Sequence, residues 1–433
     1  MANQFLNETV YANAMLLLVK NQLVMGMSVD TKFTNEVTDK NGLKIFVKRP
    51  PRFVMTSGPA LDKQDIVTGS TSIEVNQYSN VHLSITDLQY VQSYNQLMRT
   101  QTMKSAASAL AQGVDSYLQG FLKRFPSWVQ APGTAGAADY PFATAQQEIP
   151  VWTRLENMAV PSSDRVGVMN TNDAAGIQGN LIDKFITNEA VNALKKARIP
   201  MLSDIDYYRT QATDTLTTGT RSSTSGLING ASQNVNYEDV KDVMTQTLNI
   251  DTLTGSATIA QGEVFTIAGV FRINPRTQQV VTDAAGAAVL MQFTTTAAAT
   301  ASAGAVALTI SPPIIVPGTG GTTAIQRVNT AFGTASAVPA DGAAVLFAGA
   351  PSTSFAVRAA WHKSAIQLVS ARLIMPETGV ATFATDDETG ISIRYWRGSD
   401  ISTGEHVHRW DMIYGANVVD ELLGTRFSGV AVA

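Results

Sequence analysis

Residues 87–126 read DLQYVQSYNQLMRTQTMKSAASALAQGVDSYLQGFLKRFP, and this stretch is the strongest structural signal in the chain. Apolar side chains recur at every third or fourth position throughout it, which predicts one amphipathic helix. Thr86 and Gln89 have the spacing of a capping box, and Pro126 ends the pattern. At 1.5 Å per residue, the apolar repeat from residue 91 to residue 125 alone would give a helix roughly 50 Å long, far beyond the usual three turns. We therefore expect a long structural helix here.

Two segments precede this helix. Residues 8–28 carry apolar side chains at helical spacing with polar residues on the opposite side, which predicts an amphipathic N-terminal helix. That helix can dock on its own domain or on a neighbouring chain. Residues 44–81 alternate in polarity and include two adjacent prolines, which predicts an extended, strand-rich segment with little helix.

The extended segment also holds the densest positive patch of the chain. Four basic residues lie within nine positions, namely Lys44, Lys48, Arg49 and Arg52. The patch can be a solvated strand edge that Lys and Pro protect from pairing, an arm that reaches acidic groups of another subunit, or a contact with nucleic acid. The residues alone leave these three interpretations open.

The region behind the long helix predicts mixed α/β structure to about residue 225. Residues 152–158 and 187–198 are helix candidates, and residues 165–169 are a buried strand candidate. From Gly226 to Pro351 the chain is rich in Ala, Gly, Thr and Val, and short apolar runs alternate with turn residues, which predicts an all-β barrel or sandwich. The expected strands are residues 263–273, 280–281, 289–293, 305–310, 314–316 and 343–347. Because strand patterns resume at 355–359, 390–395 and 407–414, we expect this module to be inserted into a mixed domain.

Composition narrows the possible functions. Only 15% of the 433 residues are charged, against a usual ~25%, and the net charge is −4. A net acidic chain has no global positive field that would hold nucleic acid. The lack of cysteine excludes disulfides, thiolate metal sites and cysteine nucleophiles. The apolar segment 14–27 is short and interrupted by Lys20, so we expect no signal peptide or membrane span, and a soluble protein made and used in a cytoplasm.

No pattern predicts a catalytic, cofactor or metal site. His406 and His408 share one strand face beside Glu405, but a third ligand is missing, and we expect solvated or interface-facing histidines. Residues 318–323, GTGGTT, lack the Lys and the following helix pattern of a phosphate loop and are expected to form a flexible turn. Residues 386–388 are expected at a solvated hairpin tip rather than in an acid–base pair.

One charged motif near the C-terminus has a structural interpretation. Strand alternation places Arg409 and Asp411 on one face and Trp410 on the other. We expect Asp411 to pair with Arg394 or Arg409 across adjacent strands. The alternative is two unconnected surface charges.

Several segments together resemble the major capsid proteins of tailed bacteriophages. Residues 87–125 are similar to the long spine helix of this family, with an extended loop before it in the right order. Residues 355–373, which begin FAVRAAWHKSAI, resemble the penultimate strand and turn. The closing strands of these coat proteins are matched by GISIR at 390–394, DI at 400–401 and RWDMIYG at 409–415, and IDYYR at 205–209 is a further match.

The β-rich segment points to the coat proteins of short-tailed phages that carry an extra barrel domain. Residues 262–270, GEVFTIAGV, are similar to a strand of that domain. The resemblance implies an α+β fold of the tailed-phage major capsid type with an inserted all-β barrel-like domain. Its implied parts are an N-terminal arm helix (1–30), an extended loop with strands (31–86), the spine helix (87–126), α/β peripheral and axial core domains (127–225 and 352–433) and the inserted barrel (226–351).

The resemblance also implies a function. Such proteins assemble without catalysis or a cofactor, as pentamers and hexamers, into an icosahedral virion shell in the host cytoplasm. A scaffolding protein and a portal take part, no membrane is involved, and double-stranded DNA is enclosed but not tightly bound. Low surface charge fits this function because neighbouring subunits cover apolar surface. A net acidic wall also avoids gripping packaged DNA.

On this interpretation the charged loops are candidate inter-subunit contacts. The patch at Lys44, Lys48, Arg49 and Arg52 would serve as an arm. Arg272, Arg276 and Asp283 flank a loop containing Pro275, and we expect them to form salt bridges to a neighbouring capsomer. The alternative is solvated loop charges, because exposed pairs contribute only ~0–1 kcal/mol.

Three other functions remain to be weighed. An encapsulin-like cargo shell has the same fold but usually lacks the inserted barrel. A hydrolase with a β-rich accessory domain would need catalytic motifs that the chain does not contain. A secreted adhesin or surface-array protein would need an export signal or internal repeats, and neither is found.

Overall fold

A computed structural model of the chain describes residues 8–34, 43–55, 58–59, 64–86, 101–132, 139–184, 201–221, 225–386, 389–400 and 402–430. The chain divides into two compact units. The first contains residues 1–47, 72–118 and 366–417, and the second contains residues 48–71, 119–365 and 418–433. Residues 366–417, which the sequence assigned to the second half of the core, thus cluster with the N-terminal region.

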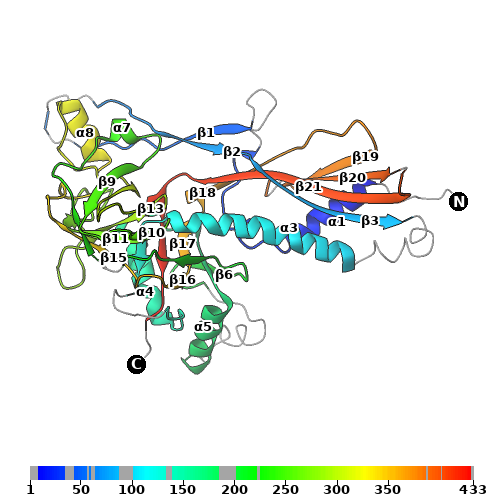
Figure 1. Cartoon of the computed structure of the whole chain (residues 1–433), viewed down its shortest axis with the longest axis horizontal. Helices are drawn as coiled ribbons and strands as arrows, with labels where there is room; N and C mark the ends of the chain where they lie inside the picture. Colours follow the sequence, from blue (N-terminus) through cyan, green and yellow to red (C-terminus); the bar gives the residue numbers. More distant parts are fainter. Residues whose placement is uncertain are drawn as a thin grey trace. The chain divides into compact units, whose positions relative to one another are not determined.

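A five-stranded sheet organises the first unit. Its long strand β21 (Glu405–Val418) pairs antiparallel with β20 (Ser392–Asp400) and with β3 (Gln77–Thr86). The strands β19 (Val380–Thr385) and β18 (Ile366–Ala371) complete the sheet, with β19 beside β20 and β18 beside β21 (Figure 1). A separate two-stranded ribbon joins β1 (Lys44–Lys48) and β2 (Ser70–Glu74).

Two helices of the first unit follow from their apolar spacing. In α1 (Glu8–Lys20) the side chains of Ala12, Met15 and Val19 are buried, and Tyr11 lies 5.9 Å from the ring of Tyr395 on β20. The N-terminal helix therefore docks on its own unit. The described part of the expected 87–126 helix is α3 (Gln101–Gln119), which continues as the 3-10 turn η2 (Gly120–Arg124), whereas residues 87–100 lie outside the described residues.

A buried carboxylate joins α3 to the N-terminal segment. Asp115 accepts hydrogen bonds from the backbone nitrogens of Val24, Met25 and Gly26 at 3.0, 2.9 and 3.3 Å. Desolvation raises the pKa of Asp115, although these three bonds oppose the shift. The turn after α1 is thus held by charge-assisted bonds as well as by packing.

The second unit contains a mixed sheet in the order β4 (Ser127–Val129), β22 (Gly424–Phe427), β17 (Ala359–His362), β5 (Arg165–Met169) and β6 (Ile205–Arg209). Helices α4 (Glu148–Asn157) and α5 (Thr171–Lys184) contribute Val151, Leu155, Ala174 and Ile177 to its core. A short pair links β7 (Thr215–Thr217) to β16 (Ser354–Ala356). Single 3-10 turns are η3 (Ala145–Gln147), η4 (Lys363–Ala365) and η5 (Glu421–Leu423). The helix expected at 187–198 lies outside the described residues.

A closed barrel forms another part of the second unit. Its strands run in the order β11 (Val264–Phe271), β12 (Leu290–Thr295), β14 (Val306–Ser311), β9 (Gln246–Asp251), β8 (Ser225–Ile228) and β15 (Ala344–Phe347). Phe265, Phe293 and Phe347 pack against one another inside it. Two short strands outside the barrel, β10 (Thr258–Ile259) and β13 (Ala299–Thr300), pair antiparallel with each other. In the chain, β10 precedes β11 and β13 precedes β14. Of the two expected folds of this module, the structure has the barrel, and the overall α+β class is confirmed.

Three local expectations for this module were wrong. Residues 314–316 are buried but form no strand, because Gln246 Oε1 and Thr334 Oγ1 accept the hydrogen bonds of Ile314 N and Ile315 N in place of a ladder partner. Residues 280–281 make only an isolated bridge. A helix does follow the glycine-rich residues 318–323. This helix, α8 (Thr323–Ala331), begins where Thr322 Oγ1 accepts a hydrogen bond from Ile325 N. It packs on the short helix α7 (Tyr237–Val240).

Candidate functional site

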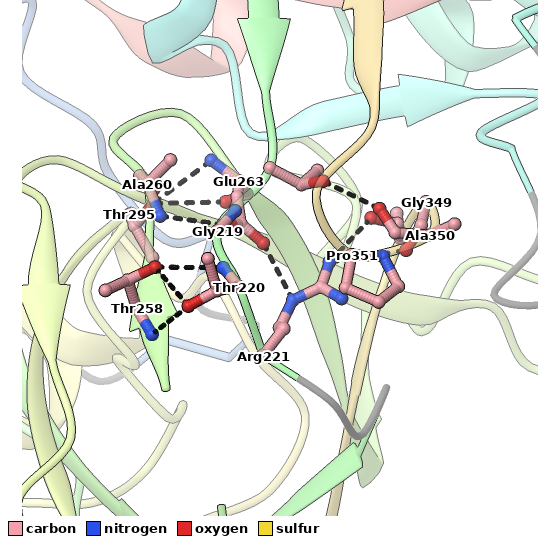
Figure 2. Close-up of polar contacts among 12 residues, drawn as sticks. Gly219, Thr220, Arg221, Thr258, Ala260, Glu263, Thr295, Gly349, Ala350 and Pro351 are labelled. Carbon is pink, nitrogen blue, oxygen red and sulfur yellow. Dashed lines mark hydrogen bonds and ion pairs between the residues drawn. The ribbon is translucent and has the colours of Figure 1, made fainter. Parts of the chain in front are cut away.

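A fully buried ion pair lies where the chain leads into and out of the barrel. Arg221 Nε donates to Glu263 Oε2 at 2.8 Å, and both side chains are 0% exposed (Figure 2). The other oxygen, Glu263 Oε1, accepts from the backbone nitrogens of Gly219 and Ala260, each at 2.7 Å. The buried carboxylate therefore accepts three hydrogen bonds, one of them from a cation, which compensates for the desolvation of its charge.

The same ion pair ties both chain segments next to the barrel. Arg221 precedes β8, and its Nη2 donates to the carbonyls of Ala348 and Gly349, which directly follow β15. Glu263 immediately precedes β11. Gly219 is required here because a Cβ would lie 1.9 Å from the carbonyl oxygen of Thr258. We call these residues the Arg221–Glu263 cluster. Local sequence patterns do not reveal this cluster, because 42 residues separate the two charges.

A second charged cluster lies on the sheet of the first unit. Asp411 is buried, and its Oδ2 accepts from Arg394 Nη2 while its Oδ1 accepts from Arg409 Nε, both at 2.5 Å. Tyr78 Oη on β3 contacts both guanidinium groups, at 3.2 Å from Arg394 and 2.9 Å from Arg409. Asp411 therefore contacts both of its expected partners. Hydrogen bonds and the charge of Asp411 outweigh burial and raise the pKa of Arg409.

The basic patch of the extended segment splits into two pairs. Lys44 and Lys48 are exposed on β1. Arg49 is 7% exposed, and it donates to the carbonyls of Val419 and Lys241, each at 2.8 Å, with Glu421 at 4.0 Å. The expectation that Arg49 is a free surface contact was wrong, because its own unit uses the guanidinium as a buried hydrogen-bond donor. Arg52 is partly exposed, 3.7 Å from Asp420 and stacked over the ring of Phe332.

The three charges expected around the barrel loop do not come together. Arg272 is 2% exposed, so its expected role as a surface contact was wrong. It is buried because its backbone still belongs to the β11 region, pairing with Val289 and Val281. Arg276 is exposed, while the exposed Asp283 accepts from the backbone nitrogens of Ala285 and Ala287 within its own turn.

The histidine motif is structural. His408 is buried, its Nδ1 lies 2.6 Å from Tyr395 Oη, and desolvation with the charges of Arg397 and His406 lowers its pKa to about 4. The expectation of solvent or interface exposure was therefore wrong for His408. Within the described residues no three His, Cys, Asp or Glu side chains gather as a metal site. None of the helices in the described ranges has the length and hydrophobicity that a bilayer crossing requires.

Several large apolar side chains of the extended segment are open to solvent. Met55 is 90% exposed and Ile66 is 73% exposed. Phe53 is exposed as well, and these three residues all belong to the second unit. Several exposed large apolar side chains in one short segment are typical of a surface that another protein covers.

Known proteins resemble this chain in structure and in sequence. A solved structure from Mycobacterium phage Che8 is 11% identical, covers 94% of this chain and 91% of its own, and has a TM-score of 0.44. The capsid structure of Cyanophage P-SCSP1u is 10% identical over 94% and 87% with a TM-score of 0.43, and the mature capsid of bacteriophage PhiM1 is 10% identical over 92% and 85% with a TM-score of 0.39. A search of curated proteins found no match. The sequence model described as "P22 coat protein - gene protein 5" matches residues 1–429. The chain therefore belongs to the P22 coat protein family.

Proposed function

We propose that this chain is a major capsid protein whose copies tile into the closed head shell of a tailed phage. The family match over residues 1–429 carries this conclusion. It confirms the resemblance inferred from the sequence and favours a phage coat protein over an encapsulin-like cargo shell. A coat protein has a structural, non-enzymatic role.

The physical features of the chain support tiling. Only 15% of its residues are charged, and apolar side chains such as Met55 and Ile66 are exposed on the extended segment. Burying that surface against neighbouring copies supplies the hydrophobic free energy that obligate interfaces use. The proposed neighbours are copies arranged as pentamers and hexamers.

The finer assignments belong to the same proposal. The region 226–351 would act as an inserted barrel domain, and 87–126 as the spine helix. The proposed inter-subunit contacts are the exposed Lys44, Lys48, Arg276 and Asp283 and the partly exposed Arg52. A scaffolding protein and a portal would direct assembly in the host cytoplasm, and a net charge of −4 would let the shell enclose double-stranded DNA without holding it tightly.

Electron microscopy of the chain produced together with the proteins encoded beside it tests the proposal. Closed, uniform shells tens of nanometres wide, containing this chain as the main component, are expected. Particles filled with a cargo enzyme instead of DNA in infected cells would favour the encapsulin-like function. Soluble monomers that turn over a small molecule would contradict both.

A further inference from the structure

Two hydrogen-bond donors of the buried Arg272 guanidinium have no acceptor among the described residues of its unit. Its side chain is 2% exposed, and its Nε and Nη2 atoms are buried without a hydrogen-bond partner in the part of the chain that the structure describes. These two nitrogens form one edge of the guanidinium group. That edge is the one that binds the two oxygens of a carboxylate or phosphate side by side.

Three other buried arginines of the second unit have partners for at least part of the Nε–Nη2 edge. Arg221 is paired with Glu263, and Arg358 is paired with Asp173 and Asp139. Arg426 lacks a carboxylate, but its three nitrogens donate to Phe125 O, Gly262 O and Thr294 Oγ1. Arg272 has neither kind of partner at its Nε–Nη2 edge.

A second positive charge makes the surroundings of Arg272 more favourable to an anion. Desolvation lowers the pKa of Arg272 well below its usual range, and the nearby charge of Arg154 lowers it further. Arg154 Nη1 donates only to neutral oxygens, Ser127 Oγ at 3.3 Å and Gln292 Oε1 at 3.0 Å. Neither arginine forms an ion pair within the described residues. Arg272 is buried and Arg154 is partly exposed, and two neighbouring cations without a counter-charge are unfavourable there unless an anion joins them.

We propose that the Nε–Nη2 edge of Arg272, with Arg154 beside it, binds a small oxyanion at the junction of the barrel strands β11 and β12 with helix α4. The ligand has at least two oxygens that one guanidinium edge can hold, as inorganic phosphate has. The same chemistry could come from a carboxylate of a neighbouring copy. In either case the anion would lock the barrel to helix α4 within the second unit.

Thermal unfolding of the full-length protein in sodium phosphate, against sodium chloride of matched ionic strength, tests the proposal. Phosphate is expected to raise the melting temperature of the wild type by several degrees beyond chloride. Arg272→Lys keeps the charge but loses the two-nitrogen edge, and it is expected to lose at least half of this shift. Arg276→Lys, a change of the exposed arginine four positions away, is the matched control and is expected to keep the full shift.

A direct measurement covers the case in which a variant folds poorly. Calorimetric titration with phosphate is expected to show one site per chain in the wild type and in Arg276→Lys, and at least tenfold weaker binding in Arg272→Lys. If unassembled subunits bind phosphate and shells do not, a neighbouring carboxylate is the ligand in the shell. Equal phosphate responses in all three proteins, or none beyond chloride in any of them, would overturn the oxyanion site.

Discussion

The Arg221–Glu263 cluster allows a quantitative test of what holds the barrel to its connecting segments. Both side chains are 0% exposed, so removing one partner leaves a buried charge without its counter-charge. Such single changes cost about 3–5 kcal/mol. Arg221→Met and Glu263→Met are each expected to lower the free energy of unfolding by this amount. In the double variant no unpaired charge remains, so its cost should stay about 2–3 kcal/mol below the sum of the two single costs.

Urea unfolding of the unassembled full-length chain, followed by circular dichroism, measures all four corners of this cycle. Lys32→Met is the control, because Lys32 is 78% exposed beside Asp30 and should cost less than about 1 kcal/mol. The reasoning is refuted if the two single costs add to the double cost within about 0.5 kcal/mol, since the ion pair would then contribute no coupling.

Three other substitutions test the Asp411 ion pairs, the buried Glu421 carboxyl and the exposed lysines of β1. Asp411→Ala should destabilise the first unit by about 3–5 kcal/mol, because it leaves Arg394 and Arg409 without their shared carboxylate, and an unchanged melting temperature would contradict this. Burial raises the pKa of the Glu421 carboxyl to about 7, whereas its ordinary value is 4.5. Between these two pH values the folded chain binds more protons at this group than the unfolded chain does. The free energy of unfolding should therefore fall as the pH rises from 4.5 to 7. Relative to Glu421→Gln, the wild type should lose up to about 3 kcal/mol across that window in urea titrations, and parallel pH profiles would count against the assignment. Lys44→Glu combined with Lys48→Glu should reduce shell yield while changing subunit stability by less than about 0.5 kcal/mol; normal yield by sedimentation would remove these residues from the interface.

Local periodicity predicted much of the fold. The three-and-four spacing of residues 101–119 indicated α3, and strand patterns indicated the strand at 44–48 and the central part, 407–414, of the strand observed at 405–418. The pairing of Asp411 with arginine was also predictable, because residues two apart on a strand share a face. These features depend on a few neighbouring residues, which is why one sequence suffices for them.

The remainder depends on distant contacts that no local pattern reports. Arg221 and Glu263 lie 42 residues apart, and each looks like an ordinary surface charge in its own segment. Arg272 is buried because β11 continues its pairing past Phe271. The helix α8 was missed because its glycine and threonine neighbours indicate a turn, although Thr322 caps it.

Sedimentation velocity of the purified chain, alone and with the proposed scaffolding protein, measures whether copies of this protein assemble and so cover one another's apolar surface. In the sample with scaffolding protein we expect a sharp boundary from a closed particle hundreds of times heavier than a single chain, as an icosahedral shell requires. A single slow boundary of monomers in both samples, at every concentration tried, would contradict it.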